Sequence, residues 1–363
     1  MHIIDKSTYK LPKGIQKILL IQLGDIGDVV WTTPSIWAVK NSIPDSKVSI
    51  LVKDGFGGIL EADPSINRIF EVKKYQGDIF DKALVQWSFL KHLRNFRFDL
   101  VVDLRLGDRG AFMSFATGAP LRVTMYHSED VPFWRNLFFT HAAKVSAPIH
   151  KRGAADQSLC ILRELGIDTA NIVPKLWVTD STRCRVQDIL TQKQVNQPQD
   201  WITINPYSRW QYKEWSDGKW IEIINWLWEE FTIPTIIIGS LEERAKAEAI
   251  IQKCKARAFN LAGETTLEEL AGLLSLSRLH IGVDSAGPHI AAATGTPTIT
   301  IYGPSDWKDW APLGKNHRVI SPDLDCAPCH QKGCDNTGRS RCLEEMTVDQ
   351  VMCVIREAIE EQS

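Results

Sequence analysis

The sequence has almost no excess of charge of either sign. Its 363 residues include 42 Lys and Arg against 44 Asp and Glu, which gives a formal net charge of −2. A protein held on nucleic acid by bulk charge needs a clear excess of basic residues, so the composition argues against this class. An anionic ligand must therefore be bound by a local group of residues.

Long hydrophobic runs are also missing. No segment offers the roughly 20 uninterrupted apolar residues of a membrane span. Residues 1–16 contain neither the apolar stretch nor the cleavage-site pattern of a secretory leader. Without a span or a leader, we expect a cytoplasmic protein. Repeats with a period of about 20–50 residues, which are typical of solenoid proteins, are absent too.

What is present is the pattern of a two-domain α/β protein. Hydrophobic residues make up 44% of the chain, and its length predicts two domains at about 100–200 residues each. Apolar segments of strand length alternate with amphipathic helices from residue 17 and again from residue 201, which is typical of parallel sheets. The polar stretch QKQVNQPQD separates the two series. The predicted division is a Rossmann-like domain at 1–180, a linker at 181–200, a second Rossmann-like domain at 201–345 and a final helix at 346–363.

The loop after the first strand contains an acidic residue where a phosphate would usually bind. Its sequence, GDIGDVV, differs from the G-x-G-x-x-G pattern of dinucleotide-binding loops. Because a carboxylate repels phosphate, we expect Asp28 to act as a general base on an acceptor hydroxyl. The alternative is that Asp28 caps its helix. The later loop DLRLGDR supplies Arg105 and Arg109, which suit an anionic acceptor, although surface arginines need no such role.

The second half contains a turn suited to a pyrophosphate. Residues 282–289, GVDSAGPH, pass from a strand into a helix through the small residues Ala286 and Gly287. Backbone N–H groups and the helix dipole at such a turn attract anions. Ser285 is expected to cap the helix and to offer its hydroxyl to a phosphate, and His289 lies one turn further on. An ordinary capped helix is the alternative.

Two other loops of the second half carry polar residues at strand ends. The segment PYSRWQYKEW contains Arg209 and Lys213, whose charges could neutralise a diphosphate, or which could belong to a solvated loop. Glu242 or Glu243 follows the next strand, where an acid often binds a ribose hydroxyl. Either acid could instead stabilise the start of a helix.

A Cys-rich loop at 326–342 has the spacing of a metal site. The pattern is Cys326-x2-Cys329-x4-Cys334-x7-Cys342, in a short polar segment beyond the last predicted strand. Disulfides are disfavoured in a reducing cytoplasm. The spacing therefore favours a structural Zn or an Fe–S cluster held by four thiolates, with free thiols or one disulfide as the alternatives.

Three segments together resemble glycosyltransferase family 9, the ADP-heptose:lipopolysaccharide heptosyltransferases. They are GDIGDVVWTTPSI, NPYSRWQYKEW and GVDSAGPHIAAATGTPTITIYGP, and they occur in the family's order between about residues 17 and 320. The resemblance implies an α/β fold of the GT-B type, with two facing Rossmann-like domains. It also implies that the first domain binds mainly the acceptor and the second mainly the nucleotide-sugar.

The resemblance assigns roles to residues of these segments. Asp28 matches the family's catalytic base, and Ser208 and Lys213 match its phosphate-contacting hydroxyl and lysine. The family's hydroxyl pair appears here as Tyr207-Ser208, and the spacing to Lys213 is one residue longer. The donor-site segment of the family is matched by Asp284, Ser285 and His289.

The activity implied is inverting transfer of a heptose from ADP-heptose to a hydroxyl of a lipopolysaccharide core or related glycan. The acceptor would be anionic and lipid-linked, which implies that the enzyme works at the inner face of the inner membrane. No metal is expected in catalysis, because no D-x-D carboxylate pair stands at a suitable strand end. The alternatives are a family member that uses another nucleotide-sugar, a GT-B epimerase, and a non-catalytic module that binds a nucleotide-sugar.

Overall fold

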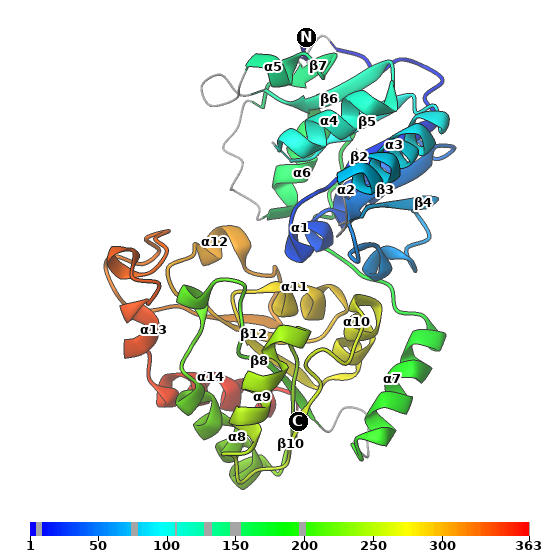
Figure 1. Cartoon of the computed structure of the whole chain (residues 1–363). Coiled ribbons are helices and arrows are strands. Elements are labelled where there is room, and N and C mark those ends of the chain that lie inside the picture. The colour runs from blue at the N-terminus through cyan, green and yellow to red at the C-terminus, as the bar shows by residue number, and fades with distance from the viewer. Residues whose placement is uncertain are drawn as a thin grey trace. The chain divides into compact units, whose positions relative to one another are not determined.

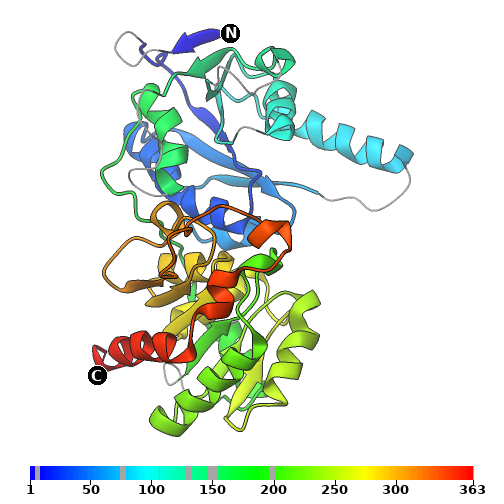
Figure 2. The ribbon, with the colours of Figure 1, turned by 90° about the vertical axis from the view of Figure 1, so that its left-hand side faces the viewer.

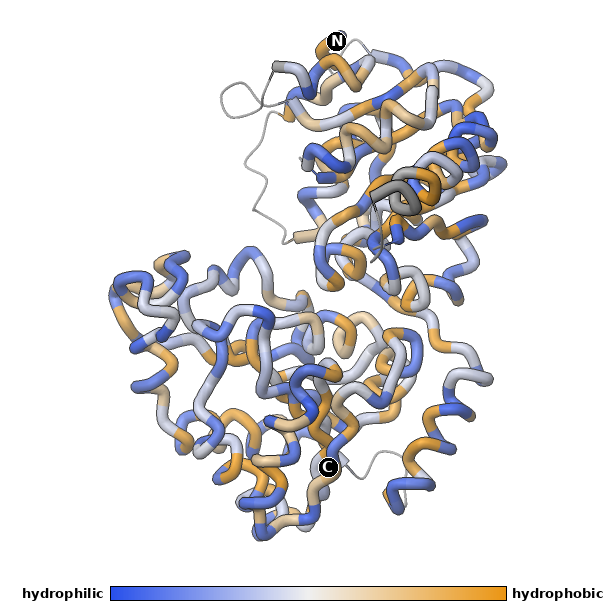
Figure 3. The backbone as a smooth tube through the Cα atoms, viewed as in Figure 1, coloured by the Kyte–Doolittle hydropathy of each residue, from blue (hydrophilic) through white to orange (hydrophobic). Residues whose placement is uncertain are grey.

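The chain forms two compact units, Met1–Pro174 and Lys175–Ser363, each built around its own sheet (Figure 1). The structure is a computed structural model, and it describes residues 1–4, 9–73, 79–105, 107–126, 133–145, 154–195 and 201–362. In both units, hydrophobic stretches alternate with hydrophilic ones along the backbone (Figure 3). None of the helices in these ranges is long and apolar enough to cross a membrane.

The sheet of the first unit is parallel throughout and has the order β1-β7-β6-β5-β2-β3-β4. The apolar run KILLI forms its central strand, with four of five residues buried, because a parallel strand is covered on both faces. The strands are β1 (His2–Ile4), β2 (Lys17–Ile21), β3 (Lys47–Lys53), β4 (Arg68–Val72), β5 (Leu100–Asp103), β6 (Leu121–Met125) and β7 (His141–Ala143).

Helices cover this sheet. α3 and α4 pack together on the side of β2 that presents Leu19 and Ile21, while α2 and α6 pack on each other. Figure 2 shows that the N-terminal end of α3 extends away from the sheet. The helical segment after β2 is divided at Thr32, because Pro34 lies in the first turn of a new helix. The helices are α1 (Ile26–Trp31), α2 (Thr33–Ser42), η1 (Gly57–Leu60), α3 (Ile79–Asn95), α4 (Asp108–Thr117), α5 (Phe133–Asn136) and α6 (Ala154–Glu164).

The sheet of the second unit is also parallel, in the order β10-β9-β8-β11-β12-β13. This is the doubly wound order of nucleotide-binding sheets, in which the winding direction changes between β8 and β11. The strands are β8 (Ile202–Asn205), β9 (Thr235–Ile237), β10 (Ala258–Asn260), β11 (Leu279–Val283), β12 (Thr298–Ile301) and β13 (His317–Ile320). The helices are α7 (Asp180–Gln192), η2 (Gln211–Lys213), α8 (Asp217–Phe231), η3 (Leu241–Glu243), α9 (Arg244–Ile251), α10 (Leu267–Leu276), α11 (Ala286–Ala293), α12 (Trp307–Trp310), η4 (Cys334–Asn336), α13 (Arg341–Glu345) and α14 (Val348–Glu360).

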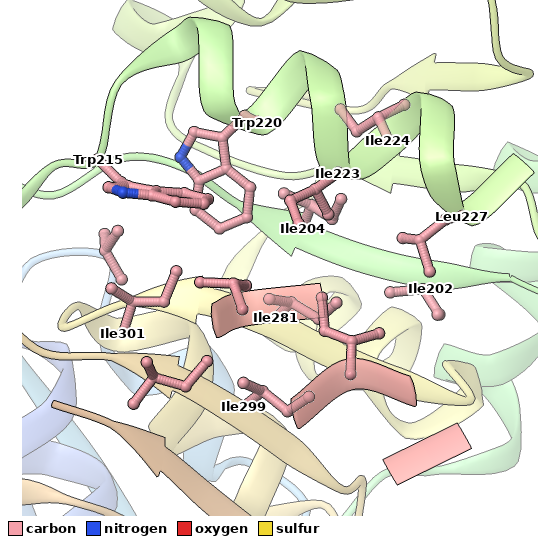
Figure 4. Packing of buried hydrophobic residues seen from close by; sticks show 14 of the residues in the cluster. Ile202, Ile204, Trp215, Trp220, Ile223, Ile224, Leu227, Ile281, Ile299 and Ile301 are labelled. Atoms are coloured by element: carbon pink, nitrogen blue, oxygen red, sulfur yellow. The ribbon is translucent and has the colours of Figure 1, made fainter. Parts of the chain in front are cut away.

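The core of the second unit explains several of its tryptophans. Trp215 and Trp220 meet edge to face, with ring centroids 5.4 Å apart, above the isoleucines of β8, β11 and β12 (Figure 4). α14 places Val351 and Ile355 in the same cluster, fully buried. The predicted final helix at 346–363 therefore belongs to the fold of this unit.

The division of the chain lies earlier than the sequence pattern suggests. Residues 181–192 of the expected linker belong to α7, which packs against α10 of the second unit. The boundary between the two compact units lies between Pro174 and Lys175. Residues 196–200, the end of the expected linker, lie outside the described residues.

Candidate functional site

The switch point of the first sheet brings Asp28 and Arg105 together. β2 and β5 are neighbours, with Ile21 opposite Asp103, so the loops after these strands emerge side by side. Arg105 forms an ion pair with Asp28 through Nη1 and Oδ2. The sequence named both residues for function, one as a base and the other as an acceptor-binding cation, without predicting that they touch.

Asp28 also caps its own helix. The same Oδ2 accepts a hydrogen bond from the backbone N–H of Asp25 at 2.7 Å, which completes a capping box at the start of α1. Capping was the alternative to catalysis in the sequence, and the structure shows it. The two roles are compatible, because the Asp28 side chain keeps 22% of its surface exposed.

Gly24 allows this approach. A Cβ atom at position 24 would collide with Nη1 of Arg105 and Oδ2 of Asp28. Gly24, the first glycine of the GDIGD segment, is therefore needed for close packing of the ion pair. Arg109, the other predicted acceptor-binding cation, is exposed in the first turn of α4.

A buried ion pair that the sequence did not predict lies beneath Arg105. Asp103 and Arg135 are 3.2 Å apart between Oδ2 and Nη2, and their side chains are 1% and 2% exposed. Burial raises the pKa of Asp103 to about 7, against the opposing effect of the Arg135 charge. Gly110 permits the approach of α4, because a Cβ there would lie 2.6 Å from Oδ1 of Asp103. Thirty-two residues separate the pair along the chain.

The switch point of the second sheet gathers the predicted donor-site residues. β8 and β11 are paired, with Asn205 opposite Gly282. Lys213 donates to Asp284 over 2.6 Å between Nζ and Oδ2, and these side chains are 20% and 8% exposed. The hydroxyl of Ser208 donates to the backbone carbonyl of Asp284 at 3.3 Å. The two loops therefore form one constellation.

Asn205 links the same two loops, a role that was not predicted from the sequence. Its Nδ2 donates to the Ser285 hydroxyl at 3.0 Å, and its Oδ1 accepts from the backbone N–H of Tyr207 at 3.2 Å. The expectation that the Ser285 side chain caps α11 is wrong. The residue occupies the N-cap position, but its side chain makes no capping bond and its hydroxyl accepts from Asn205 instead.

The start of α11 packs tightly on the sheet. A Cβ at Gly287 would lie 2.9 Å from both Nδ2 of Asn205 and Nε2 of His280. His280 is completely buried, which lowers its pKa to about 3 and keeps it neutral, and its Nδ1 lies 3.0 Å from the Thr203 hydroxyl. His289 is buried as well, in the first two turns of α11.

The two glutamates after β9 have different environments. Glu243 accepts from the backbone N–H of Ser240 at 2.6 Å and so caps the following turn. Glu242 is exposed, and hydrogen bonds from its own backbone N–H and from Ser240 lower its pKa. Nearby, Glu214 accepts from the N–H of Ser208 at 3.1 Å, and burial raises its pKa. Glu242 is therefore the better placed of the two for a ligand.

The four cysteines of the loop 326–342 are free thiols in the structure. Cys342 is buried in α13, and burial, followed by the neighbouring Cys334 and Cys329, raises its pKa to about 11. Across the described ranges, no group of three or more His, Cys, Asp or Glu side chains is arranged to hold a metal ion.

Comparison with known proteins identifies the family. The model of the family described as glycosyltransferase family 9 (heptosyltransferase) matches residues 86–339. The chain belongs to glycosyltransferase family 9. It is therefore a glycosyltransferase, and the resemblance seen in its sequence is confirmed.

This family 9 glycosyltransferase is similar to lipopolysaccharide heptosyltransferases along most of its length. It is 29% identical over 293 residues to lipopolysaccharide heptosyltransferase 3 of Escherichia coli, which covers 80% of this chain and 84% of the relative. A family 9 glycosyltransferase of Veillonella parvula superposes with a TM-score of 0.80 at 19% identity, over 95% of this chain and 97% of that one. The E. coli ADP-heptose lipopolysaccharide heptosyltransferase II gives 0.78 at 18% identity, over 96% and 100%. These likenesses confirm the GT-B fold.

Proposed function

We propose that this enzyme transfers a heptose from ADP-heptose to a hydroxyl of a lipopolysaccharide core or related anionic glycan, with inversion at the anomeric carbon. The observation that carries the proposal is the constellation at the second switch point. A lysine, a hydroxyl and the start of α11 converge there from two loops of a family 9 glycosyltransferase. Similar proteins support the choice of donor, because an E. coli heptosyltransferase with the same fold was solved with ADP-2-deoxy-2-fluoro heptose.

The donor diphosphate would bind between Lys213 and the first turn of α11. Lys213 is held by Asp284 and supplies a positive charge at the strand ends. The backbone N–H groups of Ala286 and Gly287 begin the helix, where the dipole favours an anion. Ser208 adds a hydroxyl, and exposed Glu242 can accept from a ribose hydroxyl.

The transfer step can be written from these residues. Asp28 takes the proton of the acceptor hydroxyl as its oxygen attacks the anomeric carbon, and the bond from that carbon to the diphosphate oxygen breaks. The electron pair leaves with ADP. Lys213 and the N–H groups of α11 stabilise the growing negative charge, and each such preorganised donor contributes about 3 kcal/mol in comparable enzymes. We propose that this arrangement needs no metal ion for the chemical step.

The acceptor side of the proposal rests on Arg105 and Arg109. Arg105 follows the carboxyl end of β5 and contacts Asp28, Arg109 lies in the first turn of α4, and both are exposed. Their charges suit phosphate or carboxylate groups on a glycan. We propose that the natural acceptor is lipid-linked and that the enzyme binds it at the inner face of the inner membrane.

Product analysis tests the reaction directly. The purified enzyme is incubated with ADP-β-heptose and a core oligosaccharide in EDTA, and the anomeric configuration of the product is read by NMR. We expect an α-linked heptose at an undiminished rate. A retained configuration, or loss of transfer that Mg²⁺ restores, would contradict the proposed mechanism.

Ligand-induced stabilisation tests the choice of donor and separates the alternatives. ADP-heptose at 100 times its Kd is expected to stabilise the fold by about 2.7 kcal/mol. A larger shift with a UDP-sugar would indicate a family member with another donor. A changed sugar formed without acceptor would indicate an epimerase, and binding with no turnover a non-catalytic module.

We also propose that Cys326, Cys329, Cys334 and Cys342 hold a structural Zn or Fe–S cluster. The proposal is supported by their spacing in one short loop, because thiolates at such intervals form four-ligand sites. Free thiols mean that no disulfide has to be reduced first. Binding would draw the sulfurs together and pin the loop.

A further inference from the structure

The proposed base of this enzyme is already engaged by a cation. Oδ2 of Asp28 accepts both the N–H of Asp25 and the guanidinium of Arg105. A carboxylate oxygen has two lone-pair directions, so two donors occupy Oδ2 fully. An acceptor hydroxyl that approaches Oδ2 must displace one of them, and one that approaches Oδ1 meets a carboxylate whose negative charge is already shared with a guanidinium.

Arg105 is the donor that can leave. The Asp25 N–H belongs to the backbone turn that begins α1 and stays in place as long as the helix does. The Arg105 side chain is 50% exposed and reaches Asp28 from another strand end, 77 residues away in sequence. Its guanidinium can therefore rotate toward a different anion without unfolding any element.

The backbone of Arg105 is fixed, in contrast to its side chain. Its N–H donates to Oδ1 of Asp103 at 3.2 Å, and its carbonyl accepts from Nη2 of Arg135 at 3.4 Å. Asp103 and Arg135 are themselves paired and buried. The arrangement is thus a movable charged group on a rigid support, which is suited to exchange between two anionic partners.

We propose that Arg105 determines acceptor specificity by exchange: it holds Asp28 in the resting enzyme and releases it when an anionic group of the acceptor takes its guanidinium. The inference rests on the proposed role of Asp28 as the base. The anionic group is a phosphate or a carboxylate, since both match the planar fork of arginine. A neutral acceptor leaves Asp28 held and is a poor substrate even when its hydroxyl is correctly placed.

Acceptors that differ only in charge test the exchange. Three synthetic acceptors share one hydroxyl-bearing glycan and carry a phosphate, a carboxylate or no charged group. For the wild-type enzyme we expect kcat/KM to be roughly 10- to 100-fold higher with at least one anionic acceptor than with the neutral one, the range for a charged hydrogen bond. Preference for the phosphate or for the carboxylate identifies the anion, and equal rates on all three overturn the proposal.

The variant Arg105→Gln separates exchange from simple binding. Removing the guanidinium should lower kcat/KM for the anionic acceptor and raise it for the neutral one, because Asp28 is no longer held; simple anion binding by Arg105 would predict no rise. The preference should therefore nearly disappear. Arg105→Lys, which keeps the charge but not the fork, should fall between the two. If Arg105→Gln lowers both rates by one common factor, Arg105 has a general structural role and the exchange is wrong.

Two controls keep this result separate from the fate of the proposed function. Lys91→Gln removes an exposed cation of α3 and should leave the charge preference as in the wild type. Asp28→Asn is measured with the same acceptors. If it keeps full transfer, the assignment of the base is wrong. If it is inactive while Arg105→Gln keeps the wild-type preference, only the exchange fails.

Discussion

The residues of the proposed acceptor site depend on glycines that permit close approach. Gly24 lies where a methyl group would meet both Asp28 and Arg105. Its backbone is not in the left-handed region, so Gly24→Ala is tolerated by the chain itself, and the added methyl acts on the side chains. We expect kcat/KM to fall about 10- to 100-fold with little loss of thermal stability, since small misplacements of catalytic groups have effects of this size. Unchanged kinetics in the folded variant would show that the contact has no catalytic importance.

The buried pair beneath Arg105 predicts a dependence of stability on pH. The pKa of Asp103 is about 7 in the folded protein and 3.8 in its unperturbed state. Between pH 3.8 and about pH 7, the folded state therefore binds a proton that the unfolded state has released. The stabilising contribution of this residue falls as pH rises toward 7. Urea unfolding of the wild type and of Asp103→Asn at pH 5 and pH 8 measures this contribution. From pH 5 to pH 8, we expect the free energy of unfolding of the wild type to fall by about 2 to 4 kcal/mol more than that of the variant. An equal change in both proteins would contradict the raised pKa of Asp103.

The sequence predicted which residues belong to the candidate site, but it did not predict which residues they contact. Asp28 and Arg105 follow strand ends, and a parallel sheet places its strand ends together. The strand pattern alone was therefore enough to choose both residues as candidates. Arg135 lies in the stretch after β6, where no periodicity marked a strand or helix, and its partner Asp103 was visible only as the end of a strand. The contacts of Asn205 were hidden for the same reason, because they join loops 80 residues apart.

Among the elements, α11 offers a direct test of the donor site. Its first turn packs on Asn205 and His280, and a methyl group at Gly287 would force it away from the sheet. We expect Gly287→Ala to weaken ADP binding by about tenfold, which corresponds to about 1.4 kcal/mol, as measured by calorimetry. Gly218→Ala is the matched control. It lies in the first turn of α8 with no atom within 4 Å of the added Cβ, and it should leave ADP affinity unchanged. Equal affinities of both variants would place the diphosphate elsewhere.

The Cys-rich loop makes a separate prediction. Protein purified without chelator should contain about one equivalent of zinc, or the iron and sulfide of one cluster, if the four thiolates bind a metal. Cys329→Ser should reduce the metal content and the melting temperature together. Cys184→Ser is the control, since this exposed cysteine lies in α7, outside the loop. Metal-free wild-type protein with four reactive thiols in the loop would end the proposal.

Short edge elements were the part of the fold that sequence reasoning missed. β1, β7 and β13 have three, three and four residues, and only part of each is buried. Such segments carry too few apolar residues to show a period, and their pairing is decided by the strand already in place beside them. The interior strands β2, β3 and β5 are apolar runs and were predicted.

For the whole molecule, the doubly wound order of both sheets explains where the two groups of polar residues lie. Each group stands at the point where the winding direction changes, between β2 and β5 in one unit and between β8 and β11 in the other. The difference between them is chemical. The first holds a carboxylate with arginines, and the second a lysine with a helix start. Alternation of strands and helices in the sequence was sufficient to predict this plan, but the boundary between the units depended on the packing of α7.

The role of Asp28 as the base of a glycosyl transfer can be tested with one kinetic comparison. Transfer from ADP-heptose to the core acceptor is measured for Asp28→Asn and for Asp25→Asn, a change of the exposed carboxylate on the same turn, which pairs with Lys53. We expect kcat to fall about 100- to 10,000-fold in Asp28→Asn, the range for loss of a general base, while ADP affinity stays the same and Asp25→Asn remains active. Full activity of a folded Asp28→Asn enzyme would show that Asp28 is not the base.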